Sequence, residues 1–154
     1  MMKSLANWRS LSALFLTSSA LQSQVVINEI HYDPEPKTEP VEFIELYNAG
    51  SEAVDLSGWQ FTNGIDYTFP QGESLLDPGD YLVIAENVAA YNAKFGSIFV
   101  GGVKASGEFD AGTLSNDGER VALRDAQGTL IDDVTYGVGF PWPTASQGEA
   151  HPDT

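Results

Sequence analysis

The chain has 154 residues, a formal net charge of −15 and no cysteine. This length is enough for one domain with its own hydrophobic core, and the lack of cysteine excludes a disulfide framework. Proteins bind nucleic acids largely through Lys and Arg on phosphates, so the charge excludes a nucleic-acid partner.

The first 23 residues have the layout of a secretory signal peptide. Lys3 and Arg9 give a positive start, and an apolar run broken by Ser and Thr follows. This run is shorter than the about 20 apolar residues that a membrane-spanning helix needs. We therefore expect cleavage between Ala20 and Gln24, with no membrane insertion afterwards. The expected location is secreted, periplasmic or at the cell surface, and the alternative is a frayed or amphipathic N-terminal helix.

Removal of this segment would leave five basic and 22 acidic residues, a net charge of −17. Such a chain is expected to avoid anionic lipid headgroups as well as nucleic acid. A high net charge of this kind ordinarily serves solubility. The expected partners are therefore other protein domains or cell-surface material.

Residues 24–32 form the first expected strand, and apolar and polar residues are mixed on both of its faces. Strict alternation places Val26 and Ile30 on one face, and Val25 and Ile27 on the other. Faces of this kind are typical of a strand that passes from a covered region to an edge.

The next part of the chain reads as short strands joined by tight turns. Asn63-Gly64 is the strongest hairpin signal in the chain. The expected strands cover residues 41–47, 53–56, 59–63 and 65–69.

Residues 81–85 are apolar almost throughout and are expected to form the most buried strand. A short helix is predicted over residues 88–95, with Asn87 as its N-cap and Gly96 as its stop. Short strands joined by tight turns are typical of an antiparallel β-sandwich, and we expect this helix to lie across an open end of it.

The last part of the domain is less regular. Residues 97–113 are rich in glycine, with a strand expected near 98–100 and Phe109 pointing inward. A strand over 119–124 is expected to turn into a strand over 129–136. In the latter, Leu130, Asp132, Val134 and Tyr136 are expected to share one face.

Six motifs in this order resemble the lamin tail domain family, an immunoglobulin-like fold found in nuclear lamins and in secreted bacterial proteins. They are I-N-E-I-H-Y-D-P at 27–34, E-F-I-E-L-Y-N at 42–48, V-D-L-S-G-W at 54–59, L-D-P-G-D-Y-L-V-I at 76–84, L-S-N-D-G-E at 114–119 and D-D-V-T-Y at 132–136. The signature residues are Glu42, Phe43, Ile44, Glu45, Leu46, Asn48, Asp55, Leu56, Ser57, Gly58, Trp59, Pro78, Gly79, Ser115, Asn116, Gly118 and Glu119.

The resemblance implies an all-β, immunoglobulin-like antiparallel sandwich over residues 24–143, with one short helix and an irregular tail at 144–154. In bacteria such domains are accessory modules thought to mediate anchoring or binding. We therefore expect a noncatalytic extracellular binding or anchoring module. One alternative is the N-terminal accessory domain of a larger exported enzyme, such as a nuclease or phosphodiesterase, and another is a calcium-stabilised adhesion module.

Little in the sequence suggests catalysis. There is no cysteine, and no serine lies in a G-x-S-x-G elbow. Neither His31 nor His151 belongs to a recognisable catalytic or zinc motif. Glu42 and Glu45 are three residues apart on a strand, so they point to opposite faces and cannot flank one substrate bond. We therefore expect no enzyme activity.

Three acidic clusters have the oxygen ligands that calcium prefers, although none matches an EF-hand loop. The loop at 33–40, with three prolines and three acids, is expected to be exposed. Apart from calcium, no cofactor is expected. The clusters are Asp33, Glu35 and Glu39; Asn116, Asp117 and Glu119; and Asp132 with Asp133.

Two features near the C-terminus complete the expectations. Trp142 lies between two prolines and is a candidate exposed contact or a cover for the core. The family's final S-L-x-L strand is not evident in residues 145–154, so we expect the sandwich to lack one edge strand. An uncovered edge of this kind favours self-association.

Overall fold

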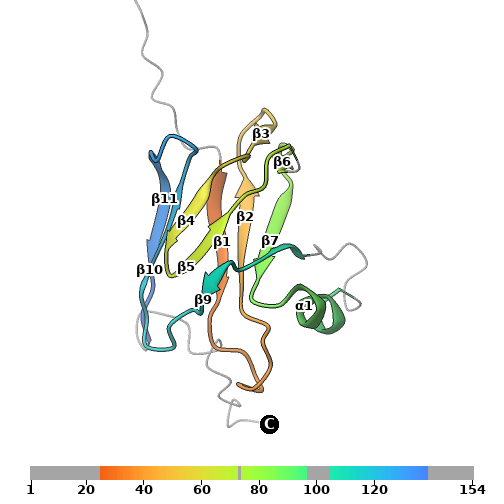
Figure 1. Cartoon of the computed structure of the whole chain (residues 1–154), viewed down its shortest axis with the longest axis vertical. Helices are drawn as coiled ribbons and strands as arrows, with labels where there is room; N and C mark the ends of the chain where they lie inside the picture. Colours follow the sequence, from red (N-terminus) through yellow and green to blue (C-terminus); the bar gives the residue numbers. More distant parts are fainter. Residues whose placement is uncertain (1–24, 73, 97–104, 139–154) are drawn as a thin grey trace, which may run out of the picture.

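The computed structural model describes residues 25–72, 74–96 and 105–138 (Figure 1). Two sheets pack face to face, and a pair of very short strands lies beside them. The larger of the two main sheets, sheet II, has the order β11-β10-β4-β5-β9 and the smaller, sheet I, has the order β1-β2-β7-β8. Sheet I comprises β1 (Val25–His31), β2 (Phe43–Asn48), β7 (Tyr81–Ala85) and β8 (Ala105–Glu108). Sheet II comprises β4 (Gln60–Asn63), β5 (Ile65–Thr68), β9 (Ala111–Gly112), β10 (Arg120–Arg124) and β11 (Leu130–Thr135), while β3 (Val54–Asp55) pairs with β6 (Leu75–Leu76).

The main core lies between the two sheets, which confirms the expected immunoglobulin-like sandwich. Inward-facing residues of both sheets supply it, and Trp59 and Phe109 pack against it while half-buried. No helix among the described residues is long and apolar enough to cross a membrane. The largest fully buried side chains of the main core include Phe61, Phe69, Ile44, Leu46, Leu56, Ile84 and Leu123.

One strand pair departs from the expected antiparallel pattern. β8 runs parallel to β7, with Ile84 opposite Gly107. The strand expected near 98–100 lies outside the described residues, and β8 was not predicted because its sequence, ASGE, carries no apolar alternation.

A bulge in β1 changes which of its side chains face the core. Ile27 lies opposite Leu46, whereas Glu29 lies opposite the next residue of β2, Glu45, so Asn28 is the extra residue. The extra residue reverses the alternation. Val25, Ile27, Ile30 and Tyr32 therefore all join or contact the main core. The two-faced assignment from strict alternation was wrong for this reason.

The helix α1 (Val88–Lys94) begins as predicted, because the Asn87 side chain accepts a hydrogen bond from the Ala90 amide. Its position was predicted wrongly. It covers the outer face of sheet I, where Tyr91 packs in a second core with Phe43 and Val83. β7 is therefore buried on both faces along most of its length, which explains why its sequence is almost continuously apolar.

A second bulge alters the expected face of β11. Leu123 lies opposite Asp132 while Arg124 lies opposite Leu130, so Ile131 is the extra residue. Leu130 is consequently 41% exposed, whereas Ile131 packs against the core. Leu130 does not share a face with Asp132, contrary to the expectation.

Asn48, one of the signature residues, is fully buried and holds three chain segments together. Its side-chain amide donates to the carbonyl oxygens of Glu52 and Leu76, at 2.8 and 2.9 Å, and its side-chain oxygen accepts from the Gly50 amide. An unpaired buried amide would cost free energy, so this position depends on all three bonds. The signature residue Asn48 therefore supports the fold rather than a reaction.

Candidate functional site

A small recess of about 140 Å³ opens where the loop after β1 meets the start of β2. It brings together parts of two of the clusters predicted from the sequence, since Asp33 and Glu39 line it together with Asn116. Glu42 and Glu86 also line the recess, and the sequence analysis did not predict that these acids lie together. Glu35, Asp117 and Glu119 do not line the recess.

The loop is exposed at 35–38 and at 40, as expected, but its first residue Asp33 is only 5% exposed. Its carboxylate lies close to the Lys37 ammonium, with Nζ 3.2 Å from Oδ1 and 3.3 Å from Oδ2. Oδ2 accepts a hydrogen bond from Lys37, whereas Oδ1 has an ion-pair distance without hydrogen-bond geometry. This ion pair neutralises Asp33 from the solvent side.

Lys94 of α1 ties the same loop to the helix. Its ammonium donates to Glu39 Oε2 and to the Glu35 carbonyl oxygen, both at 2.6 Å. Two carboxylates predicted as calcium ligands, Asp33 and Glu39, are thus already paired with lysines of the chain.

Glu42 is the most perturbed carboxyl group of the recess. It is 8% exposed, and its Oε2 accepts a 2.8 Å hydrogen bond from the Leu114 amide. Burial raises the pKa of Glu42 from 4.5 to about 7; the bond from Leu114 opposes this, and the negative charges of Glu86, Glu119 and Asp33 add to it. This group can hold a proton near neutral pH, but its contact is with the chain's own backbone.

The remaining candidate ligands also bond within the fold. Glu119 Oε1 accepts from the Ser115 amide at 2.6 Å and lies 3.1 Å from the Tyr136 hydroxyl. Asp132 Oδ2 accepts from the Ile27 amide at 2.8 Å, which links sheet II to the edge of sheet I. Within the part of the chain that the structure describes, no three His, Asp or Glu side chains are placed to hold a metal ion.

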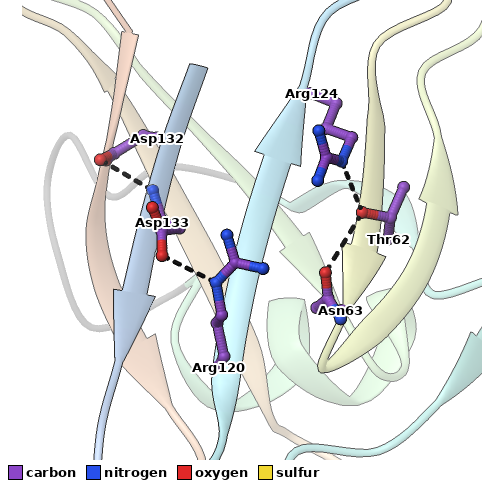
Figure 2. A network of polar contacts seen from close by, with 6 residues as sticks. All are labelled: Thr62, Asn63, Arg120, Arg124, Asp132 and Asp133. Atoms are coloured by element: carbon purple, nitrogen blue, oxygen red, sulfur yellow. Dashed lines mark hydrogen bonds and ion pairs between the residues drawn. The ribbon is translucent and has the colours of Figure 1, made fainter. Parts of the chain in front are cut away.

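Figure 2 shows that the outer face of sheet II is paired internally. Arg120 donates to Asp133 at 2.8 Å, and Arg124 donates to the Thr62 hydroxyl at 3.3 Å. Such exposed pairs are ordinary features of a solvated sheet face.

The outer face of sheet I differs, because α1 covers only part of it. Beyond the helix, Val26, Tyr47 and Tyr81 lie directly opposite one another on three neighbouring strands. The rings of Tyr47 and Tyr81 stack with centroids 4.7 Å apart, and Tyr81 is 44% exposed. The sequence analysis missed this row, although the alternation of Phe43, Glu45 and Tyr47 marks the outward face of β2.

His31 lies on the same face but belongs to the packing under α1. Its ring stacks on Phe43 at 5.0 Å and meets the edge of Phe95 at 5.9 Å. Burial lowers the pKa of His31, with a further lowering from Lys94. Trp142, His151 and the predicted signal peptide lie outside the described residues.

Comparison with known proteins agrees with the sequence motifs. The model of the Lamin Tail Domain family matches residues 18–138. No curated protein matches the chain.

Proposed function

The chain belongs to the lamin tail domain family, a family of noncatalytic immunoglobulin-like domains, and on that premise we propose that it is a binding module of an exported protein. In this proposal it attaches the protein to other protein domains or to cell-surface material. The N-terminal segment with its Lys3 and Arg9 supports export.

The observation that carries the proposal is the row of Val26, Tyr47 and Tyr81 on the outer face of sheet I. Tyrosines that expose part of an apolar ring and a hydroxyl are enriched at protein interfaces. In the recess, in contrast, lysines of the same chain pair with Asp33 and Glu39, and a backbone amide bonds to Glu42. The site for a partner is therefore the sheet face rather than the recess.

Site-specific cross-linking tests this proposal. A photoreactive phenylalanine in place of Tyr81, in cells that export the chain, is expected to yield adducts with another macromolecule. The matched control places the same group at Leu130, which is similarly exposed but lies on sheet II. Equal adduct yields from both positions, or none from either, would contradict the proposal.

An activity screen tests the noncatalytic part. The purified chain is expected to show no turnover of nuclease, phosphodiesterase, esterase or protease substrates, with or without divalent metal ions. Turnover that disappears on substitution of His31 or Glu42 would show that the assignment is wrong.

Two alternatives from the sequence stand as proposals with their own tests. An accessory domain of an exported enzyme requires a catalytic domain encoded in the same reading frame. A calcium-stabilised adhesion module requires calcium to raise the melting temperature more than sodium does at equal ionic strength. The meeting of Asp33, Glu39 and Asn116 in one recess is the observation that favours this second test.

A further inference from the structure

We propose that the outer face of sheet I binds an extended, arginine-bearing segment of a partner protein. An arginine would lie over the Tyr47 and Tyr81 rings with its guanidinium directed at Glu29 and Glu45. This inference rests on the proposed binding function and adds the chemistry of the partner.

The two rows of side chains are neighbours on the same face. Tyr81, Tyr47 and Val26 form the first row, and one step along the strands Glu45 lies opposite Glu29. Glu45 and Tyr47 are two residues apart on β2, so the rows are separated by about 7 Å. An arginine side chain is long enough to lie along one row and reach the other.

The second row contains a repulsion between like charges. Like charges directly opposite on neighbouring strands destabilise a sheet. Burial raises the pKa of Glu29, and the negative charge of Glu45 raises it further. Glu45 receives one hydrogen bond, 2.7 Å from Nδ2 of Asn28, which is the bulged residue of β1. The bulge therefore places two carboxylates opposite each other on neighbouring strands; Asn28 donates to one of them, and the negative charges of both act on Tyr91 of α1.

The cations of the described residues bond elsewhere, and a cation from a partner would offset the repulsion. None of them forms an ion pair with Glu29 or Glu45, and each bonds to an acid, a hydroxyl or a carbonyl oxygen on another surface. These residues are Lys37 with Asp33, Lys94 with Glu39, Arg120 with Asp133, and Arg124 with Thr62 and Gly128.

Charge and aromatic chemistry together favour arginine on a protein segment. A guanidinium stacks on tyrosine faces and pairs with carboxylates in a planar fork, which an ammonium does not match. A second copy of this chain would carry the same net charge of −15 and be repelled. Phosphate-bearing partners such as nucleic acids and anionic lipids are disfavoured for the same reason.

The test uses the full chain and a capped octapeptide in which arginine alternates with valine. The control peptide has citrulline, the neutral isostere, at each arginine position. We expect the arginine peptide alone to bind in a calorimetric titration, with affinity that falls as salt increases. In NMR spectra, amide shifts are expected along β1, β2 and β7 and not along β10.

Variants of the chain distinguish the contribution of this face to binding from the contribution of the overall negative charge. Glu29→Gln with Glu45→Gln is expected to weaken binding by at least about tenfold, and Tyr81→Ala by about two- to fivefold. The matched control, Glu52→Gln with Asp66→Asn, removes two exposed charges elsewhere and is expected to change affinity less than about twofold. Because the first double variant relieves repulsion, its melting temperature should equal or exceed that of the parent, so lost binding would not reflect unfolding.

The outcomes distinguish this inference from the proposed function. Equal binding of the citrulline peptide, equal weakening by both double variants, or no arginine binding at millimolar peptide would overturn the inference. If cross-links from position 81 still form in that case, the binding function stands and only the partner chemistry is wrong. If neither cross-links nor peptide binding occur, both fail.

Discussion

Glu42 offers the most direct test of the recess, through the dependence of folding stability on pH. Its pKa is raised from 4.5 in the unfolded reference to about 7 in the folded protein. The folded state therefore holds this proton more tightly than the unfolded state does. The stabilising contribution of the proton is complete below about pH 4.5, is lost as pH rises toward 7, and changes no further above that pH.

The magnitude follows from the same values. Each tenfold change in proton affinity corresponds to about 1.4 kcal/mol, so ionised Glu42 lowers the free energy of unfolding by at most about 3 kcal/mol at pH 8. Glu42→Gln keeps the shape and an oxygen acceptor for the Leu114 amide but cannot ionise. We expect the variant to match the parent at pH 4.5 and to be more stable by about 1–3 kcal/mol at pH 8.

Urea unfolding of both proteins at a series of pH values measures this difference. A change of 1 kcal/mol moves the midpoint by about 0.3–1 M urea, which is readily measured. Glu52→Gln is the control, because it removes an equal charge from an exposed position. If the parent and Glu42→Gln have the same pH dependence, Glu42 is not held as a perturbed acid and the reasoning about the recess fails.

Three further predictions concern the stability of the fold. Asp132→Ala leaves the Ile27 amide of β1 without its 2.8 Å acceptor and should lower the free energy of unfolding by about 1–3 kcal/mol. The neighbouring Asp133→Ala removes an exposed ion pair and should lower it by less than about 1 kcal/mol in the same urea assay. Gly118→Ala should lower the melting temperature more than Gly128→Ala. Both glycines have positive φ, but a Cβ at 118 would lie 2.6 Å from backbone atoms while one at 128 meets open space. Millimolar calcium should raise the melting temperature no more than sodium at equal ionic strength, since lysines already pair two of the recess acids; a calcium-specific rise of several degrees would contradict this.

Much of the fold was predictable because its signals are local. Asn63-Gly64 is followed by the expected return strand, and Gly64 adopts the positive φ of 81° that the turn needs. Asn87 caps the helix through its own side chain. The apolar run at 81–85 becomes the strand buried on both faces along most of its length. Each of these signals acts within a few residues of the chain.

The predicted site was recovered only in part, because burial and register are set by distant segments. Asp33 and Asn116 are 83 positions apart in sequence, and only the packed loops bring them to one recess. The opposite orientation of Glu42 and Glu45 was predicted correctly, but the raised pKa of Glu42 comes first from its burial and then from the charges of Glu86 and Glu119, against the hydrogen bond from Leu114. No pattern around residue 42 carries that information.

The bulge at Asn28 shows how one extra residue links the core to the proposed binding face. A strand with a period of two moves all later side chains to the other face when one residue is inserted. In β1 the insertion keeps Ile30 in the core after Ile27, and by the same step it places Glu29 opposite Glu45 on the outside. The unfavourable acidic pair is thus a geometric consequence of satisfying the core. Strain persists where the surrounding structure compensates for it, as the packing of Ile27 and Ile30 does here, and in our proposal a cation from a partner offsets the remaining repulsion.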